Sequence, residues 1–232
     1  MNGAHTRRLG LGALMLGAAW FLAAEEPVPE GEKMKTAGVD WVVDNLQKIG
    51  GHEAKVEGAP KVVETDKGPA VSFDGRKDAI LLETNPVEGL RAFSVEVLFR
   101  PAAGGAEEQR FFHLQEEVGE NRLLLETRMP QPDLWYGDTF LKSGKNQKAL
   151  NDPKATHPAA QWHTLALVYD GTEMTQYVDG KKELSGKAAF PPMKKGRASL
   201  GARMNLVSWF KGEIRRVRIT PRALAAEELL RP

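Results

Sequence analysis

The chain has 232 residues, of which 41% are hydrophobic and 27% charged, a globular composition that excludes collagen-like and disordered chains. Its 32 Lys and Arg balance 31 Asp and Glu, so the net charge of +1 gives no overall positive field for nucleic acid, and no such partner is predicted. The absence of Cys excludes a disulfide framework, thiolate metal sites and a cysteine nucleophile.

The amino-terminal segment, residues 1–24, has the pattern of a secretory signal peptide. Arg7 and Arg8 precede an apolar run over residues 9–22, and two alanines follow it. This run is shorter than the roughly 20 residues that a helix needs to cross a bilayer. We therefore expect export to the periplasm or the cell exterior, by the Sec or the twin-arginine route, and no membrane span after processing.

Two short segments follow the signal peptide. Residues 25–38 are acidic and contain Pro and Gly, which predicts a flexible leader. Apolar residues then recur at helical spacing, at Val39, Val42, Leu46 and Ile49. We expect a short amphipathic helix and a linker over residues 39–54.

From residue 55 to residue 232 the pattern changes to short runs rich in β-formers, separated by Gly, Pro, Asn and Asp at intervals of about ten residues. This spacing is typical of a β-sandwich. The predicted strands are residues 70–73, 79–82, 93–100, 110–115, 122–128, 134–141, 162–169, 174–178, 198–204 and 213–220.

Two of the connections contain hairpin signals. Asp170-Gly171 and Asp179-Gly180 each separate a strand from the next, and Gly favours the positive φ that tight turns need. Residues 140–158, by contrast, are polar and poor in β-formers, which predicts a long loop that is either functional or mobile.

The last strand has an odd offset between its apolar residues. Ile214 lies three residues before Val217, whereas Val217 and Ile219 alternate regularly. A bulge at residues 215–216 would place all three on one buried face. Pro221, at a permitted first-turn position, then predicts a short C-terminal helix.

Several of these segments, in this order, resemble the laminin-G-like, concanavalin A-like jelly-roll family. They are FSVEVLFRP at residues 93–101, WHTLALVYDG at 162–171 and YVDG at 177–180, and the likeness continues through residues 199–201, 210–214 and 218–224. The resemblance covers residues 55–232 and implies an all-β fold, an antiparallel two-sheet jelly-roll sandwich. Members are often exported and often bind glycans or adhere to cells. The family implies no particular reaction, because this fold hosts lectins, glycosidases, lyases and inert spacers.

The strands also carry a polar face. In residues 93–100 the apolar side chains alternate with polar ones, so one face is predicted to be core and the other solvent-facing. The same separation on the next three strands gives eight candidate ligand-binding residues: Glu96, Arg100, His113, Gln115, Glu126, Arg128, Tyr136 and Asp138. None is Lys, the usual solvating residue. If the strands are neighbours, these groups suit a hydroxylated or acidic saccharide.

The competing interpretation of this face is an ordinary solvated sheet with paired charges. An enzymatic interpretation is also open, because His, Tyr and Arg serve in acid/base chemistry and carboxylate recognition. However, the signatures of the alginate-lyase branch are absent, and Glu126-Thr127-Arg128 is only weakly similar to one of them. The strand with paired carboxylates that is typical of the glycosidase branch is absent too.

Two other groups of residues have ordinary structural explanations. Trp162 is interpreted as a packing residue and His163 as a hydrogen-bonded edge histidine. Calcium accompanies this fold often, and two pairs of acidic residues could supply oxygens: Asp74 with Asp78, and Asp170 with Asp179. Turn geometry alone explains these pairs, and the sequence contains no specific calcium-binding motif. Calcium binding therefore stays an open alternative.

The leading hypothesis is an exported module that binds carbohydrate or a cell-surface partner without turnover. The first alternative is a glycan-active enzyme, a polysaccharide lyase or glycoside hydrolase, that uses His113, Glu126, Arg128 and Tyr136. The second is a structural or assembly protein, which would be favoured if the predicted helix of residues 39–49 or another chain covered the polar face. The sequence does not name the glycan or the oligomeric state.

Overall fold

The computed structural model describes residue 1 and residues 38–232. The predicted signal peptide and all but the last residue of the predicted leader therefore lie outside the described residues, apart from Met1. Within the described part of the chain, no helix is long and apolar enough to cross a membrane.

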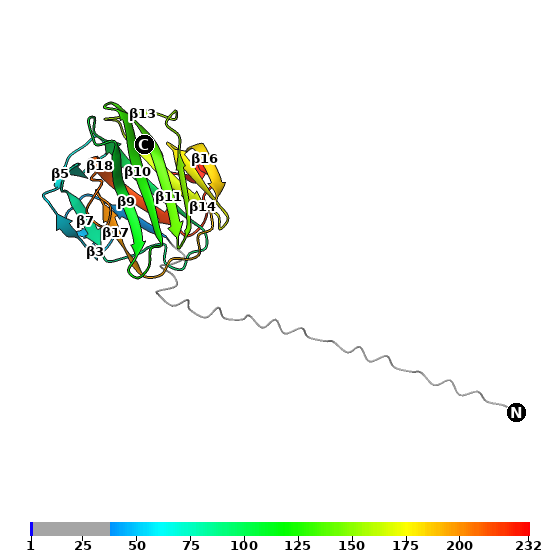
Figure 1. Cartoon of the computed structure of the whole chain (residues 1–232). Helices are drawn as coiled ribbons and strands as arrows, with labels where there is room; N and C mark the ends of the chain where they lie inside the picture. The colour runs from blue at the N-terminus through cyan, green and yellow to red at the C-terminus, as the bar shows by residue number, and fades with distance from the viewer. Residues whose placement is uncertain (2–37) are drawn as a thin grey trace.

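The described residues form a sandwich of two eight-stranded antiparallel sheets, which we name sheet I and sheet II. Sheet I has the order β16 (Lys181–Lys187), β15 (Glu173–Val178), β14 (His163–Tyr169), β8 (Phe93–Pro101), β18 (Lys211–Thr220), β6 (Ala70–Asp74) and β5 (Lys61–Val63), with β1 (Val39–Val42) on β18. Sheet II has the order β12 (Asn146–Asn151), β11 (Leu134–Ser143), β10 (Arg122–Gln131), β9 (Glu108–Glu116), β17 (Gly196–Leu200), β7 (Ala79–Leu82) and β4 (Lys55–Glu57), with β13 (His157–Pro158) on β11. A small hairpin of β2 (Lys48–Ile49) and β3 (His52–Glu53) stands apart from both sheets. The predicted all-β jelly-roll sandwich is confirmed (Figure 1).

The core lies between the sheets, where the apolar residues of alternating strands meet. Phe93, Val95, Val97 and Phe99 of β8 are all buried, as the alternation in this strand predicts. Phe99 stacks on Phe111 of β9 with ring centroids 4.3 Å apart. The Trp135 ring packs against Phe99 in a T-shaped arrangement, with the two centroids 5.1 Å apart. Each such buried aromatic or aliphatic side chain stabilises the fold by roughly 1.5–3 kcal/mol.

The predicted bulge in the last strand is confirmed. The register of β18 against β8 shifts between Ile214 and Arg216. Because of this shift, Ile214, Val217 and Ile219 are all buried on one face. The bulge also marks a change of neighbour, since β18 pairs with β6 up to Ile214 and with β1 from Arg216 onward.

Each predicted strand overlaps an observed one, but the ninth ends earlier than predicted. It stops at Leu200 instead of Met204, because Gly201 adopts a φ of +82° and turns the chain away. The two predicted hairpin turns are confirmed: β14 and β15 join at Asp170-Gly171, and β15 and β16 join at Asp179-Gly180. Asp179 and Gly180 both have positive φ, as a type I′ turn requires.

The amphipathic helix predicted within residues 39–54 is wrong, because this segment forms strands β1 to β3. Its apolar residues follow the two-residue period of a strand: Trp41 and Val43 are buried, whereas Val42 between them is exposed.

The long loop predicted over residues 140–158 is also wrong. Most of this segment forms β12 and the end of β11, which pair around a turn at Gly144. Its polar composition reflects an edge strand, where much of the backbone and most side chains meet water.

The predicted C-terminal helix is reduced to a single 3₁₀ turn, Ala226–Glu228. Instead of forming a helix, residues 221–232 lie across the outer face of sheet I. Leu224 and Leu229 pack there against Ala166 and Val168 of β14. We call residues 221–232 the C-terminal strap.

Candidate functional site

The structure brings six of the eight predicted ligand-binding residues together on the outer face of sheet II. His113 and Gln115 lie on β9, Glu126 and Arg128 on β10, and Tyr136 and Asp138 on β11. These three strands are direct neighbours, as the prediction assumed. We call this surface the polar face.

Glu96 and Arg100 lie elsewhere, so the prediction that they share this face is wrong. Both belong to β8 in sheet I, because the chain crosses from one sheet to the other between β8 and β9. Glu96 is fully buried and accepts hydrogen bonds from Arg218 at 2.6 and 2.8 Å and from the Leu230 N–H at 2.6 Å. Its role is to hold the C-terminal strap.

Arg100 has an equally structural environment. It donates to Glu213 at 3.0 Å, and its guanidinium carbon lies 5.0 Å from the centre of the Trp162 ring. Trp162 is mostly buried and donates to Asp66 at 2.8 Å, which confirms it as a packing residue.

Strand register places charged partners opposite one another on the polar face. Glu126 of β10 is opposite Asp138 of β11 and opposite Arg110 of β9. Arg110 Nε lies 3.2 Å from Glu126, and Arg128 lies 2.8 Å from Asp138 and 3.5 Å from Glu126. Glu108 contacts both arginines. The result is an ion-pair network in which arginine and carboxylate groups alternate.

This network forms part of a pocket of about 230 Å³. Most of the pocket is built on four adjacent strands, and one residue comes from the loop that follows β17. Its lining residues are Arg110, Arg122, Leu124, Glu126, Arg128, Asp138, Phe140, Ala149, Asn151 and Arg203. Four arginines thus face two carboxylates in one small space.

The sequence analysis missed several of these lining residues. Arg122 stands at the start of a predicted strand, on the same side as Glu126, so alternation alone could have added it. Arg110 lies three residues before His113, so alternation would have placed it on the opposite side, and the register shift between β9 and β10 brings it to the polar face. Arg203 had no such signal. It was predicted to lie inside a strand, whereas it lies in a loop that folds back over β9.

That loop, residues 201–210, has an unusual backbone. Leu206 and Ser208 adopt φ values of +57° and +55°, which non-glycine residues rarely do and which cost on the order of 1–3 kcal/mol each. The loop is tied to β9, since Arg110 donates to both Glu108 and the Ser208 hydroxyl, and its own N–H donates to the Ser208 carbonyl at 2.8 Å. The strained loop therefore holds Arg203 at the pocket.

The same loop covers His113, which is fully buried. His113 lies opposite Leu124, a pocket residue, and its Nδ1 accepts a 2.9 Å hydrogen bond from the Met204 N–H. Burial, with the nearby charges of Arg203, Arg122 and Arg110, lowers the pKa of His113 to about 3. At neutral pH the ring is thus uncharged and carries its hydrogen on Nε2, which has no hydrogen-bond partner within residues 38–232.

The pKa of Glu126 is shifted in the opposite direction, upward. Only 3% of the residue is exposed, and this burial raises the pKa of Glu126 to about 7, an effect that Arg110 opposes and Asp138 reinforces. Its Oε2 has no hydrogen-bond partner among the described residues. Near neutral pH this carboxyl is therefore close to half protonated.

Unsatisfied polar atoms are concentrated around this pocket. Five buried side-chain atoms here make no hydrogen bond in the described part of the chain: Arg110 Nε, His113 Nε2, Arg122 Nε, Glu126 Oε2 and Asp138 Oδ1. Two of them, Arg110 Nε and Glu126 Oε2, do lie within ion-pair distance of an opposite charge, at 3.2 and 3.5 Å. Each buried unsatisfied group costs about 1–3 kcal/mol, so such a cluster calls for an explanation. Four of the five atoms belong to side chains that line the pocket, so a ligand with both donors and acceptors can satisfy those four once it shifts these side chains slightly.

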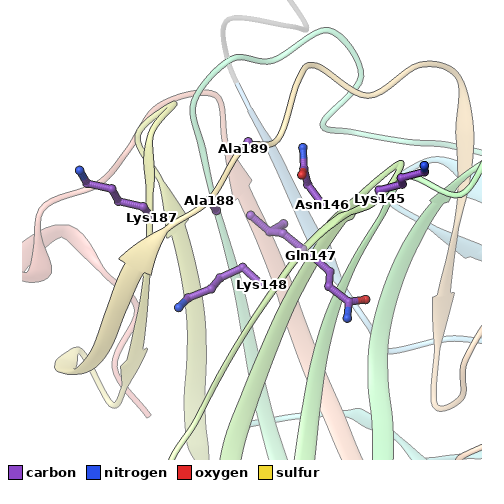
Figure 2. Close-up of a pocket in the computed structure, with 8 residues that line it drawn as sticks. Lys145, Asn146, Gln147, Lys148, Lys187, Ala188 and Ala189 are labelled. Atoms are coloured by element: carbon purple, nitrogen blue, oxygen red, sulfur yellow. The ribbon is translucent and has the colours of Figure 1, made fainter.

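A second hollow, of about 360 Å³, lies between the β11–β12 turn and the end of β16. It contains three lysines, Lys145, Lys148 and Lys187. Figure 2 shows that their amino groups point in different directions instead of converging on one point. This hollow therefore lacks the convergent geometry of the pocket on the polar face.

The acidic residues considered for calcium serve as turn caps. The Asp74 carboxylate accepts backbone N–H groups of residues 76, 77 and 78, and Asp78 accepts those of residues 59 and 74. Asp170 accepts from residues 172 and 173, and Asp179 from residue 164 and from His163. No group of three or more metal-ligating side chains with suitable geometry occurs in the described residues.

His163 is a hydrogen-bonded buried histidine, as expected. Its Nδ1 lies 2.8 Å from Asp179 and its Nε2 lies 2.9 Å from the Pro158 carbonyl oxygen. Both ring nitrogens are thereby occupied, and the residue fixes the β15–β16 turn against β13.

Comparison with known proteins gives one family match and many structural matches. The laminin-G-type family model of the concanavalin A-like lectin/glucanases superfamily matches residues 74–230. No curated protein matches the chain significantly.

Three solved structures illustrate the structural similarity. Domain 4 of AbnA, a GH43 extracellular arabinanase from Geobacillus stearothermophilus, solved in complex with arabinotriose, is 18% identical with a TM-score of 0.58, over 82% of this chain and 95% of that domain. The binding domain of Paraclostridial Mosquitocidal Protein 1 is 13% identical with a TM-score of 0.62, over 84% of this chain and 51% of the toxin domain. A heptameric SAP-like pentraxin from Limulus polyphemus is 13% identical with a TM-score of 0.57, over 68% of this chain and 78% of the pentraxin.

At these identities the solved structures share the fold alone, and the chain spans about half the length of the toxin binding domain. The family match includes most of both sheets and every strand of the polar face. The chain belongs to the concanavalin A-like lectin/glucanase superfamily.

Proposed function

We propose that this chain is a carbohydrate-binding module and that its saccharide binds in the pocket on the polar face. The observation that carries the proposal is the cluster of five buried, unsatisfied polar atoms around that pocket. Both hydrogen-bond donors and acceptors are among them, and sugar hydroxyls can complement both kinds. The pocket is smaller than the roughly 300–1,000 Å³ typical of drug-sized ligands, which favours one sugar unit at a time.

The comparisons support a carbohydrate ligand. Domain 4 of the arabinanase is described as a complex with arabinotriose, and it has the same fold over most of both chains. Because the identity is only 18%, its ligand contacts do not transfer to this chain residue by residue. Arabinotriose is nevertheless a reasonable neutral probe.

The proposal includes export to the periplasm or the cell exterior. The basic and apolar pattern of residues 1–24 supports this location, and the related arabinanase is described as extracellular.

Turnover of a glycan is the second candidate function, and one observation favours it. A carboxyl group whose pKa is close to 7, as burial makes that of Glu126, can act as a general acid near neutral pH. Asp138 lies directly opposite it on the neighbouring strand, so two carboxyl groups share the site. Glu126 is therefore the residue to test for catalysis.

A structural or assembly role has less support. The segment considered as a cover for the polar face, residues 39–49, contributes β1 to sheet I instead. Within the described residues the pocket stays open to solvent.

The test is a binding screen of the purified protein against neutral and acidic oligosaccharides, with each mixture then assayed for new reducing or unsaturated ends. Binding without new ends would support a binding module, and Asp138→Asn should weaken it while Asp133→Asn, an exposed change in the β10–β11 turn, should not. New ends that disappear in Glu126→Gln would establish an enzyme instead. Failure to bind any saccharide would contradict the proposal and leave the structural role.

A further inference from the structure

We propose that one end of this pocket is an anion subsite, formed by Arg122 and Arg203, which selects saccharides that carry a carboxylate or sulfate group. The proposal rests on the proposed function, because it assigns a class of saccharide to the same pocket. It extends that function by giving the pocket two chemically different ends.

The two ends differ in how their arginines are paired. Arg110 and Arg128 each contact carboxylates of the network. Within residues 38–232, by contrast, no carboxylate lies within ion-pair distance of Arg122 or Arg203, and the hydrogen bond of Arg122 to the Glu120 carbonyl is long, at 3.4 Å. The guanidinium of Arg122 instead lies 5.6 Å from the centre of the Phe140 ring, which orients it along the pocket wall. One end of the pocket thus carries two arginines without a direct carboxylate partner among the described residues.

The effect of this charge extends to its neighbours. Burial lowers the pKa of Arg122, and the charges of Arg203 and Arg110 lower it further, whereas Glu120 and Glu126 act in the opposite direction. The same three arginines act on His113. Cations placed this close together repel one another, and an anion bound between them would remove that repulsion.

His113 lies beneath this end, fully buried under the loop, and is not among the residues that line the pocket. Since its Nδ1 accepts from the Met204 N–H, its Nε2 presents a hydrogen, and that donor is buried without a partner in the described part of the chain. Because the His113 ring is uncharged, it does not neutralise the two arginines above it, and their N–H groups match an anion, which only accepts hydrogen bonds. The planar guanidinium groups also match the two oxygens of a carboxylate or of a sulfate.

The opposite end of the pocket suits the neutral part of such a ligand. Glu126, Asp138 and the side-chain amide of Asn151 lie there, and a carboxylate on the ligand would be repelled by the first two. Sugar hydroxyls can donate to these oxygens. The pocket therefore favours a sugar oriented with its acidic substituent toward Arg203 and its hydroxyls toward Asp138.

The experiment compares four probes by calorimetric titration: trigalacturonate, its methyl ester, a sulfated galactan oligosaccharide and inorganic sulfate. The ester keeps the shape of trigalacturonate but lacks its charge. We expect at least about tenfold weaker binding of the ester than of one of the acidic saccharides, consistent with loss of charge-assisted hydrogen bonds. Preference for trigalacturonate or for the sulfated oligosaccharide identifies which acidic group is used.

The variants Arg203→Gln and Arg122→Gln should each weaken binding of the acidic saccharide by about tenfold or more, and should weaken binding of the ester much less. Arg197→Gln is the matched control, because Arg197 also lies on the outer face of sheet II but does not line the pocket. It should change affinity less than about twofold. Circular dichroism of each variant checks that it is folded. If Arg203→Gln disturbs the loop of residues 201–210, Arg122→Gln still tests the subsite, because Arg122 lies on strand β10.

The contrary outcomes are distinct. Equal binding of acid and ester, unchanged in Arg203→Gln, would overturn the anion subsite while leaving the carbohydrate-binding function intact. Equal losses in Arg203→Gln and Arg197→Gln would also overturn it, because they would indicate nonspecific attraction. Binding of inorganic sulfate with no saccharide bound would contradict the proposed function as well as the selection of saccharides.

Discussion

The two outer faces of the sandwich contain the same kinds of residues in different roles. On sheet I, Glu96 is buried against Arg218, and the C-terminal strap covers the pair. On sheet II, Glu126 is buried beside Arg110 and Arg128, and no described segment covers the pocket. Each face thus contains a buried glutamate next to arginine.

The difference lies in how many hydrogen bonds are completed. Glu96 accepts from two nitrogens of Arg218 and from a backbone N–H. Glu126 has an oxygen with no partner in the described chain, and four other buried atoms around it share that condition. A satisfied buried ion pair holds a structure together, whereas an unsatisfied one leaves room for a ligand. Residue type alone does not distinguish the two.

The largest effect should follow from breaking the satisfied pair. We expect Glu96→Ala to lower the free energy of unfolding by about 3–5 kcal/mol, because it leaves Arg218 unpaired beneath the C-terminal strap. Urea denaturation at pH 7 measures this loss. A loss below about 1 kcal/mol would show that the strap does not depend on Glu96.

The second-largest effect on the free energy of unfolding should be a pH dependence that comes from Glu126 on the polar face. The pKa of Glu126 is about 7 in the folded protein, above its ordinary value of 4.5, so the stability it contributes is present below pH 4.5 and is lost as the pH rises through 7. Glu126→Gln should therefore be more stable than the wild type at pH 8, by on the order of 2–3 kcal/mol, and equal to it near pH 4.5.

Urea denaturation of both proteins at pH 4.5, 6 and 8 gives this difference directly. His113 acts in the opposite direction, because its pKa of about 3 makes stability fall as the pH drops below 6.5. The histidine is present in both proteins, so its contribution cancels. A difference that does not vary with pH would contradict the assigned pKa of Glu126.

A smaller effect is expected from the apolar anchor of the strap. Leu229 packs on a small cluster instead of the main core, so Leu229→Ala should cost about 2 kcal/mol, the lower end for a buried leucine. Saccharide binding should not change, since the strap and the pocket lie on opposite faces. Weaker binding in this variant, with folding intact, would show that the two faces are coupled.

The smallest effect should come from an exposed charge on the polar side. Arg197 lies 3.9 Å from Glu83, and both side chains are largely exposed. Arg197→Gln should change the free energy of unfolding by less than about 0.5 kcal/mol. A larger change in thermal denaturation would mean that outer charges on sheet II stabilise the fold, which would weaken the distinction between the two faces.

Sequence periodicity predicted much of this fold and part of the site. Alternation shows which side of a strand a residue occupies, so His113, Glu126 and Asp138 were correctly placed on one face. Alternation does not show which sheet a strand joins, and for this reason Glu96 and Arg100 were grouped with residues on the opposite side of the molecule.

The remaining errors have similar causes. Spacing in the segment after residue 38 fits a helix, but burial of Trp41 and exposure of Val42 follow from pairing with β18, a strand almost 180 residues later. Arg203 reaches the pocket only because its loop folds back over His113. Contacts between distant parts of the chain decide both features, and no local pattern encodes them.

The C-terminal strap has a practical consequence for handling the protein. Arg231 donates to the carbonyl of Asp179 and to that of Ala226, so the last residues are held against sheet I. An affinity tag or surface linker fused after Pro232 would thus leave from the side opposite the pocket. Protein immobilised through such a fusion should present its arginine-lined hollow to the surrounding solution, which makes this the preferred attachment for surface-based glycan screening.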